Sequence, residues 1–316
     1  MSGPALILFA WAVEAACGWP RWLHARIAHP VVWLGALIDA LDRTLNRAAW
    51  PHALRYAAGA AATALTTAIA AGSALAIVRI LPNTLWGHAG EVLAASSLIA
   101  SRSLYDHAAA VAAPLMRGDL ARARTAASMI VGRDTHALDE GGIARASLES
   151  LSENASDGVV APVFWGALFG LPGVAAYKAV NTLDSMIGHR NDAYAAFGGV
   201  AARADDIANL IPARLTGVFI AAASGRADAF AVMLRDAGAS RSPNAGWPEA
   251  AMAGALGVRL SGPRAYGATL SDEPWINAGA RDPGADDIRR GLGLYLRALV
   301  LAFAALAGPV LMAETG

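Results

Sequence analysis

The chain has 316 residues, of which 56% are hydrophobic and only 16% are charged, and its mean hydropathy is +0.41. A soluble domain has about a quarter of its residues charged, so this composition predicts a membrane protein, with an alanine-rich soluble enzyme as the alternative. The net charge of zero gives no electrostatic indication of a nucleic-acid partner. The single cysteine, Cys17, excludes an internal disulfide framework, and the lack of a basic residue before it argues against a cleaved signal peptide.

Apolar segments predict an all-α, multi-pass helical membrane protein that forms one integral-membrane domain over residues 1–316. The clearest span begins at Tyr56, because no charged residue interrupts the chain until Arg79. A span needs ~20 apolar residues, and the other segments are either shorter than this or interrupted by a proline or a charged residue. The predicted spans are 4–18, 56–80, 84–100, 159–180, 207–223 and 291–312.

The distribution of arginine predicts the topology. Residues 19–55, 101–158 and 224–290 hold nearly all the arginines and should share the cytoplasmic side. Strict alternation would then place the loop after 159–180 on the opposite side and divide a polar constellation across the bilayer. We therefore expect 159–180 and 207–223 to be broken or re-entrant helices that keep this constellation on one face, between polar cytoplasmic loops.

That constellation lies in residues 132–214, the predicted catalytic stretch. Charged and amide side chains crowd here around an apolar segment, and they include Lys178, the only lysine of the chain. Polar groups inside an apolar chain cost solvation energy unless they are paired or used. The stretch is therefore the default hypothesis for an active site.

Three carboxylates follow an arginine at helical spacing in the first part of the stretch. Arg145, Glu149, Glu153 and Asp157 are each four residues apart, so the carboxylates can converge on one helix face. A solvated face with an Arg–Glu pair is the simpler interpretation. Because Asp157 leads directly into the apolar segment, a divalent cation bound by Glu149, Glu153 and Asp157 is the functional alternative.

A second polar set follows the apolar segment. Lys178, Asn181 and Ser185 share a helix face, and Asp184 lies one turn from Asn181. The functional interpretation is a catalytic lysine beside polar groups. The structural one is a lysine at the edge of a span whose ammonium reaches the headgroups.

Asp205, Asp206 and Asn209 form a DDxxN motif at the polar start of the next apolar segment. Oxygen ligands at this spacing suit Mg²⁺ bridging a polyphosphate. The structural alternative is a carboxylate pair favoured by the dipole of a helix N-terminus.

Arginines could bind phosphate through bidentate hydrogen bonds, and the candidates are Arg133, Arg203 and Arg214. Arg133 and Asp134 belong to a GRDT sequence that has the composition of a loop. No Walker, Rossmann, zinc or serine-hydrolase motif occurs. The residues alone thus indicate a membrane-embedded, Mg²⁺-dependent enzyme for a phosphate-bearing substrate, with phosphate-driven ligation or prenyl or phosphatidyl transfer as its chemistry.

A family resemblance favours the ligation. The chain resembles the adenosylcobinamide-phosphate synthase (cobinamide synthase) family of cobalamin biosynthesis over nearly its whole length. The matching motifs are HPVVWLG at 29–35, GRDT at 132–135, ESLSENASDGVVAP at 149–162, YKAVNTLDSMIGH at 177–189, FGG at 197–199, DDIANLIPAR at 205–214 and SPNAGWPEAAMAGALGV at 242–258.

The resemblance implies a multi-pass protein of the inner membrane with its active site on the cytoplasmic side. Its reaction would join adenosylcobyric acid to (R)-1-aminopropan-2-ol phosphate, or a similar amino-alcohol phosphate, with cleavage of ATP. Mg²⁺ would be required, and other cobalamin-biosynthesis enzymes are candidate partners. There are two alternatives. One is an intramembrane Mg²⁺-dependent prenyl or phosphatidyl transferase, and the other is a corrinoid-binding scaffold without catalysis.

Residue chemistry then suggests roles within such a ligase. Lys178 would stabilise developing charge, and Asp184 or His189 would accept the proton of the attacking amine. Mg²⁺ would be held by Glu149, Glu153 and Asp157 on one side and by Asp205 and Asp206 on the other. Substrate and phosphate binding is predicted for Arg133, Asp134, Asn154, Asn181, Arg203, Asn209 and Arg214.

Overall fold

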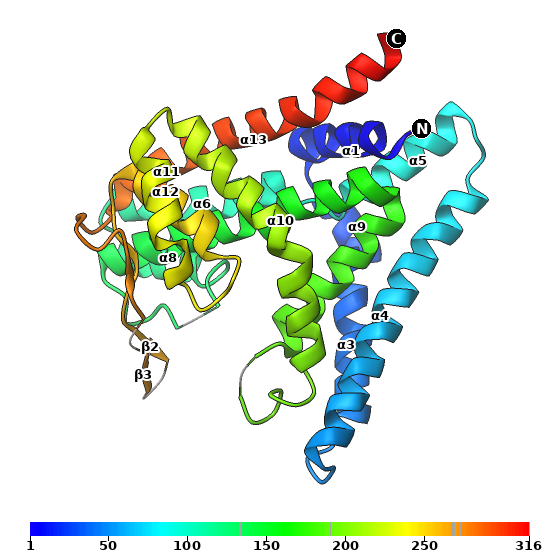
Figure 1. Ribbon diagram of the computed structural model, residues 1–316, viewed down its shortest axis with the longest axis horizontal. Coiled ribbons are helices and arrows are strands. Elements are labelled where there is room, and N and C mark those ends of the chain that lie inside the picture. Colours follow the sequence, from blue (N-terminus) through cyan, green and yellow to red (C-terminus); the bar gives the residue numbers. More distant parts are fainter. Residues whose placement is uncertain (133, 190, 267–268, 272, 316) are drawn as a thin grey trace. The chain divides into compact units, whose positions relative to one another are not determined.

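The computed structural model describes every residue of the chain except 133, 190, 267–268, 272 and 316. Backbone contacts divide the chain into two compact units, whose helices Figure 1 labels. Unit 1 comprises Met1–Ala100, Ala161–Asn209 and Pro309–Gly316, and unit 2 comprises Ser101–Val160 and Leu210–Gly308.

Unit 1 is built entirely of helices over its described residues. The helices α1, α3, α4 and α5 each pack against α9. A small apolar core lies between α3, α4, α9 and the start of α10. The core residues are Ile38, Ala62, Leu183, Ile187, Phe197 and Ala201. The helices are α1 (Gly3–Cys17), α2 (Arg21–Ile27), α3 (Pro30–Leu45), α4 (His52–Ile80), α5 (Leu85–Ser96), α9 (Ala161–Ile187) and the first turns of α10 (Gly199–Ser224).

Unit 2 is a second helical body with its own, larger apolar core. The core includes Leu148, Met252 and Tyr295, and the Tyr295 hydroxyl donates to the Ser101 carbonyl over 2.8 Å. The helices are α6 (Ser101–Met116), α7 (Leu120–Ala127), α8 (Glu140–Ala155), a π-helical turn (Ser156–Val160), the rest of α10, α11 (Ala227–Asp236), a 3-10 turn (Ala237–Ala239), α12 (Gly246–Leu256) and most of α13 (Ala285–Thr315).

The strands of the described chain are confined to a short part of unit 2. The pair β1 (Leu260–Ser261) and β4 (Trp275–Ile276) is antiparallel, and so is the hairpin of β2 (Arg264–Tyr266) and β3 (Thr269–Ser271). The sequence did not predict these strands, which are two or three residues long. The all-α fold class is confirmed, since the strands only decorate a helical body.

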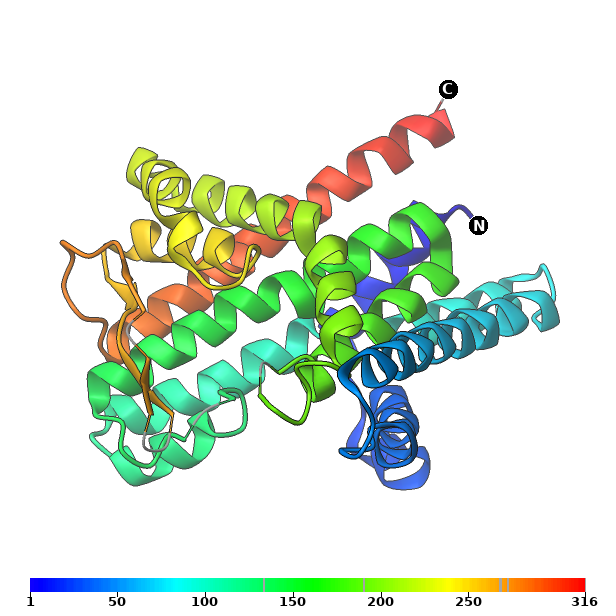
Figure 2. The same ribbon diagram turned by 60° about the horizontal axis from the view of Figure 1, so that its bottom comes forward.

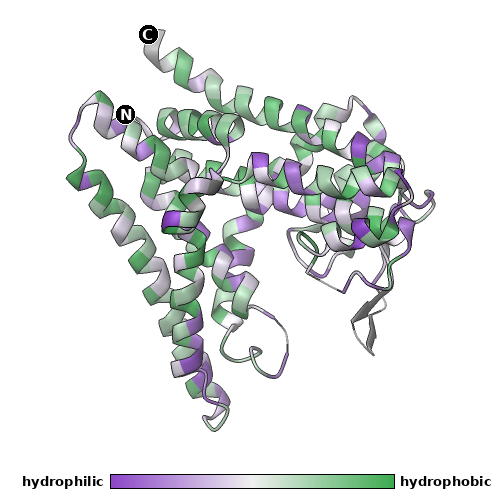
Figure 3. Ribbon diagram, turned by 180° about the vertical axis from the view of Figure 1, so that it is seen from behind, coloured by the Kyte–Doolittle hydropathy of each residue, from purple (hydrophilic) through white to green (hydrophobic). Residues whose placement is uncertain are grey.

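Four helical segments are long and apolar enough to cross a membrane, among the described residues. Each contains one predicted span: 56–80 lies in His52–Ile80, 207–223 in Gly199–Ser224 and 291–312 in Ala285–Met312. The span 159–180 lies in the 48-residue run Glu140–Ile187. Figure 3 shows α13 as hydrophobic over most of its length, with hydrophilic residues near its start. The chain is therefore a multi-pass membrane protein.

Two other predicted spans are short helices in the structure. The range 4–18 forms α1, with 15 residues, and the range 84–100 forms α5, with 12 residues. At 1.5 Å per residue these helices are shorter than the ~30 Å hydrocarbon layer. The α5 helix begins where the Thr84 hydroxyl accepts from the Gly87 amide, directly after the Pro82-Asn83 turn that the sequence indicates.

The predicted break in the 159–180 segment is confirmed at Gly170. Its backbone has φ 64° and ψ −153°, a conformation that glycine adopts without a side-chain clash. The two arms then pack on each other, because a Cβ added at Gly166 would lie 2.5 Å from Val174 and one at Gly173 would lie 2.4 Å from the Trp165 carbonyl oxygen. Figures 1 and 2 show α9 turning back on itself at this point. The segment is a helical hairpin rather than one straight helix.

Candidate functional site

The second arm of α9 and the first turns of α10 bring seven polar side chains of unit 1 together. Helical spacing places them on facing surfaces, since residues three and four apart share one side of a helix. We call this group the α9–α10 cluster, and its members are Tyr177, Lys178, Asn181, Asp184, Asp205, Asp206 and Asn209.

The buried carboxylate of Asp205 is the centre of the cluster. It is 8% exposed and accepts from the Asn209 amide over 3.0 Å and from the Asn181 amide over 3.5 Å. The Tyr177 hydroxyl donates to Asn209 Oδ1 over 2.9 Å, and Lys178 Nζ donates to Asn181 Oδ1 over 3.4 Å. Each amide thus connects a donor on one side to the carboxylate on the other, which fixes its orientation. Buried polar groups are stable in an apolar protein when they are paired in this way.

Asp184 and Asp206 lie beside this network. The Asp184 carboxylate interacts electrostatically with Asp206 and with His189, and it is also close to Asp205. It sits against the end of α9, because a Cβ at Gly188 would lie 2.0 Å from its Oδ1. A side chain at position 188 would therefore displace the Asp184 carboxylate.

The loop that follows α9 is docked on α4 through close backbone contacts. A Cβ at Gly59 would lie 1.8 Å from the Phe197 carbonyl oxygen, and one at Gly198 would lie 1.6 Å from that of Ile187. Tyr194 in this loop donates to Asp42 Oδ2 over 3.2 Å. Burial, with the adjacent Asp42 carboxylate, raises the pKa of Tyr194, so its phenol stays protonated. These contacts position the loop that carries His189.

Two predicted residues of unit 1 lie at the edge of the cluster. His189 is exposed, with its ring centroid 6.3 Å from that of Tyr194. Arg203 is also exposed; it donates to the Tyr56 hydroxyl over 3.0 Å and lies over the Tyr56 ring. Both side chains are exposed and so accessible to a ligand.

The first predicted acidic set lies in unit 2 and is arranged differently. Glu149 is 5% exposed, and its Oε1 accepts from the Ser261 amide over 2.7 Å, which holds β1 against α8. Glu153 is exposed one turn further along α8, and Asp157 is half-buried in the π-helical turn. The predicted fourth member, Arg145, is paired with Asp282 over 2.6 Å. A metal role of these carboxylates therefore stays a prediction.

The remaining predicted residues also belong to unit 2. Arg214 donates to the Leu210 carbonyl over 2.7 Å and lies 4.6 Å above the Trp247 ring. The Asn154 amide donates to Ser150, and the Asp134 carboxylate accepts from the His136 amide over 2.8 Å. Arg133, the other predicted phosphate ligand, lies outside the described residues.

A magnesium ion fits the α9–α10 cluster only as a site shared with substrate. Among the described residues, no three His, Cys, Asp or Glu side chains are arranged to hold a metal ion. Mg²⁺ is commonly bound through one or two carboxylates, with waters and substrate phosphates completing its octahedron. Asp184 and Asp206 are close enough to interact electrostatically, and these two carboxylates match that smaller donor set. Asp205 differs, since amide groups already donate to both of its oxygens.

Sequence reasoning missed two members of this part of the fold. Tyr177 is 3% exposed and completes the hydrogen-bond network, although the sequence drew attention only to its neighbour Lys178. The indole of Trp165 donates to the Ala208 carbonyl over 3.0 Å and so connects the first arm of α9 to α10. A tyrosine beside the only lysine, in an apolar segment, was the available signal, because a buried hydroxyl needs a partner.

The fold and the cluster define a class: a multi-pass helical membrane protein with a buried carboxylate network between a helical hairpin and the next helix. The model of the CobD/Cbib protein family matches residues 7–295, so the chain belongs to that family. It is similar over 300 residues, at 55% identity and 95% coverage of both chains, to the cobalamin biosynthesis protein CobD of Rhodobacter capsulatus.

Other relatives have the same name. The chain is 44% identical to the cobalamin biosynthesis protein CobD of Rhizobium meliloti, over 97% of this chain and 98% of that protein. It is 47% identical to that of Brucella suis, over 92% and 91% of the two chains. No solved structure matches the chain. The family that the sequence motifs indicate is thus confirmed at the level of the CobD/Cbib proteins.

Proposed function

We propose that this chain acts in cobalamin biosynthesis as an ATP-dependent amide ligase. It would join adenosylcobyric acid to (R)-1-aminopropan-2-ol phosphate, or a similar amino-alcohol phosphate, to give adenosylcobinamide phosphate. Family membership supports the pathway. The observation that carries the chemistry is the α9–α10 cluster, where hydrogen bonds and electrostatic interactions connect a lysine and three aspartates.

The first step activates the carboxylic acid. A carboxylate is a poor electrophile, because its oxygen is a poor leaving group. Attack of the substrate carboxylate on the γ-phosphorus of ATP would form an acyl phosphate and release ADP. The Lys178 ammonium would stabilise the charge that develops on the transferring phosphoryl group, and Asn181 holds that ammonium in place through its Oδ1.

The second step forms the amide. The amine of the amino-alcohol phosphate attacks the acyl carbon, the carbon–oxygen bond to phosphate breaks, and inorganic phosphate leaves. The attacking nitrogen must lose a proton, and His189 would accept it, with the neighbouring Asp184 carboxylate stabilising the imidazolium that forms. Arg203, exposed at the edge of the cluster, would bind the phosphate group of ATP or of the amino alcohol.

Magnesium belongs to this proposal as the ion that accompanies ATP. Asp184 and Asp206 would hold it, and when bound it would neutralise charge on the phosphate oxygens. Asp205 would position the two amides and, through Asn181, the lysine, rather than bind the ion itself.

The proposed location is the inner membrane, with the cluster open to the cytoplasm. ATP and the amino-alcohol phosphate are water-soluble and charged, so they must reach the cluster from an aqueous side. The re-entrant form of α9 supports this, because a hairpin returns the polar end of α9 without a full crossing. Other cobalamin-biosynthesis enzymes are candidate partners.

The coupling of ATP cleavage to amide formation tests the proposal. Purified protein in detergent would be given adenosylcobyric acid, aminopropanol phosphate and Mg-ATP, and ADP and product would be quantified together. We expect one ADP for each adenosylcobinamide phosphate and no product without ATP. Turnover of a lipid diphosphate without ATP would instead support a prenyl or phosphatidyl transferase, and tight corrinoid binding without product would support a scaffold.

A matched pair of variants links the activity to the cluster. Asp206→Asn removes one carboxylate of the proposed magnesium set while keeping the size of the side chain. Asp106→Asn makes the same change in α6 at an exposed residue that pairs with Arg102. We expect product formation to be lost in the first variant and kept in the second, with both proteins folded in detergent.

A further inference from the structure

Four arginines of unit 2 line a cavity of about 390 Å³. Arg226 follows the end of α10, and Arg289, Arg290 and Arg297 lie along the first part of α13. The apolar side chains of Leu256 and Leu294 form another part of the wall. We call this cavity the arginine pocket; it shares no residue with the α9–α10 cluster.

The spacing of the α13 arginines explains why they face one cavity. Arg289, Gly293 and Arg297 are four residues apart, so they lie above one another on a single helix face. Gly293 leaves open space between the two arginines, since a Cβ added there meets no atom within 4 Å. The helix thus presents two guanidinium groups on either side of a gap without a side chain.

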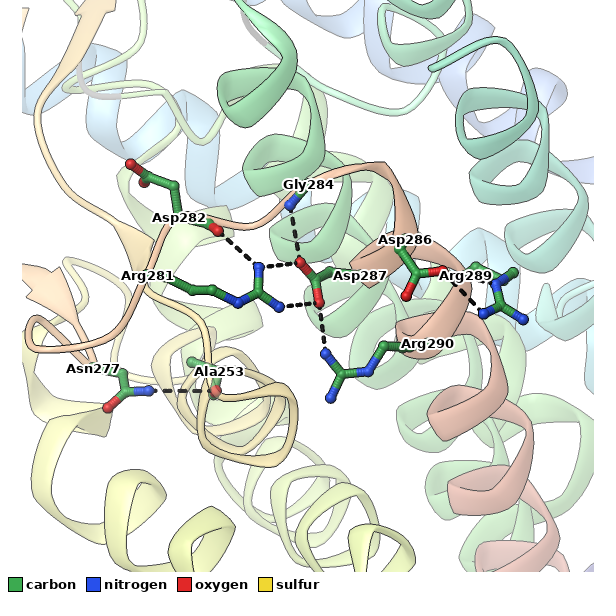
Figure 4. Close-up of polar contacts among 9 residues, drawn as sticks. All are labelled: Ala253, Asn277, Arg281, Asp282, Gly284, Asp286, Asp287, Arg289 and Arg290. Atoms are coloured by element: carbon green, nitrogen blue, oxygen red, sulfur yellow. Dashed lines mark hydrogen bonds and ion pairs between the residues drawn. The ribbon is translucent and has the colours of Figure 1, made fainter. Parts of the chain in front are cut away.

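Ion pairs around the pocket leave an excess of positive charge. Arg226 pairs with Asp228 over 2.9 Å and Arg289 pairs with Asp286 over 2.9 Å. Asp287 must serve both Arg281 and Arg290, each over 2.7 Å (Figure 4).

Arg297 is the least neutralised of the group. It donates to the Gly293 carbonyl over 3.3 Å, and no carboxylate of the described residues pairs with it. The described ion pairs here join four arginines to three aspartates, and Arg297 adds a fifth guanidinium group. An excess of positive charge in a partly apolar cavity favours an anionic ligand.

The position of the pocket in the chain indicates that it lies at a membrane surface. Candidate spans α10 and α13 end and begin here, at Ser224 and at Ala285, and the polar segment between them starts and finishes on the same side. Arginine forks form bidentate hydrogen bonds with carboxylate and phosphate alike, but a phosphate group has three acceptor oxygens to share among several guanidinium groups.

We propose that the arginine pocket binds a phosphate-bearing anion at the membrane surface. The ligand is either a soluble phosphate ester or the headgroup of an anionic phospholipid, since both present the same phosphate oxygens. A soluble ester would bind within a water-filled pocket. A lipid would place its headgroup phosphate between Arg289 and Arg297 and its acyl chains along the apolar part of α13.

Two variants test the pocket from opposite directions. Arg297→Gln removes a charge without exposing a buried carboxylate, because Arg297 pairs with none among the described residues. Gly293→Phe fills the gap without a backbone clash. The matched controls are Arg122→Gln, an exposed ion-paired arginine of α7, and Gly308→Phe, a second glycine of α13 with open space around it.

Binding would be measured on the full chain in nanodiscs. In phosphatidylcholine discs, calorimetry measures the binding of inorganic pyrophosphate. In discs that also contain phosphatidylglycerol, native mass spectrometry measures how much of this lipid the protein retains. We expect one of the two probes to bind the wild type and both controls. Arg297→Gln should weaken it about tenfold, as for loss of one charge-assisted hydrogen bond, and Gly293→Phe should abolish it.

The probe that binds identifies the source of the phosphate. Pyrophosphate binding that phosphatidylglycerol does not displace would assign a soluble ester, and retained phosphatidylglycerol with no pyrophosphate binding would assign a lipid. The proposal is overturned if neither probe binds the wild type, or if Gly293→Phe binds as the wild type does while circular dichroism shows all variants equally helical.

Discussion

Two polar regions of this chain use the same residue types with opposite balances of charge. In the α9–α10 cluster, three aspartates meet one hydrogen-bonded lysine among the side chains described there. At the start of α13, by contrast, Asp286 and Asp287 are ion-paired with arginines (Figure 4), and Arg297, further along the helix, donates among the described residues only to a backbone carbonyl. A surplus of carboxylate oxygens suits a cation, and a surplus of guanidinium groups suits an anion.

The comparison also separates catalytic candidates from structural ones. Glu149 and Asp282 of unit 2 each have partners that hold neighbouring segments together, namely the Ser261 amide and two arginines. The three aspartates of the α9–α10 cluster also lie close enough to interact electrostatically with one another, and such proximity of like charges is unfavourable unless a cation or proton is bound. Four changes test this distinction, from the largest expected effect to the smallest.

Replacing Lys178 by Met should have the largest effect. Methionine keeps the length of the side chain and removes the charge, so the protein should fold while product formation falls by about 100-fold or more. Amide formation with Mg-ATP is the measurement. The exposed Arg43→Met in α3 is the control for loss of a cation in the same unit. Near-normal turnover of the lysine variant would contradict a catalytic role for the cluster.

Gly59→Ala should destabilise unit 1 by about 1–3 kcal/mol, the usual cost of forcing atoms into a filled space. Its Cβ would lie 1.8 Å from the Phe197 carbonyl oxygen and would push away the loop that carries His189. Gly72→Ala in the same helix is the matched control, since its Cβ meets nothing within 4 Å. Thermal unfolding in detergent should show a lower midpoint for the first variant only. Equal midpoints would mean that the loop is not docked on α4.

Glu149 distinguishes a structural carboxylate from a metal ligand. If it only accepts from the Ser261 amide, Glu149→Gln keeps an acceptor and should retain turnover. Glu149→Ala leaves that amide unpaired and should destabilise the fold by about 1–2 kcal/mol. Thermal unfolding and turnover of both variants are the measurements. Loss of turnover in a fully stable Glu149→Gln protein would restore the predicted metal role of this residue.

Asp282 gives the smallest effect, and it depends on pH. The hydrogen bond from Arg259, with the adjacent Arg145, lowers the pKa of Asp282 to about 2. Because the folded pKa lies below the unfolded value of about 3.9, this stabilisation is complete above pH 4 and is lost as the pH falls towards 2. Since the group is exposed and screened, it amounts to less than about 1 kcal/mol.

The measurement for this pair is thermal unfolding at several pH values between 2 and 6. The wild type should lose stability relative to Asp282→Asn as the pH falls from 4 to 2, and the two should differ by a constant amount above pH 4. A difference that does not change with pH would show that the arginine pairing contributes nothing to the fold.

Much of the fold follows from local sequence. The charge-free run after Tyr56 forms α4, and α9 is broken at Gly170, close to Pro172, in the segment for which a break was predicted. The short strands were not predicted, since segments of two or three residues carry no periodicity. The shortness of α5 was also missed, because hydropathy alone does not show where a helix ends.

The candidate site was only partly predictable for a related reason. Spacing on one helix places Lys178 and Asn181 on a common face, and the structure confirms their hydrogen bond. Contacts between helices depend on packing. The sequence therefore could not predict the hydrogen bond from Asn181 to Asp205 or the one from Tyr177 to Asn209. Glu149 shows the converse, since helical spacing alone gave no sign of its bond to Ser261, 112 residues away.

The central claim is that the α9–α10 cluster performs an ATP-driven amide ligation. Mass spectrometry of products from purified wild type and Asp206→Asn, each with adenosylcobyric acid, aminopropanol phosphate and Mg-ATP, tests it most directly. We predict adenosylcobinamide phosphate and equimolar ADP from the wild type, and neither from a folded Asp206→Asn protein. Equal product from both proteins would contradict the assignment of the site, and no product from the wild type would contradict the ligation itself.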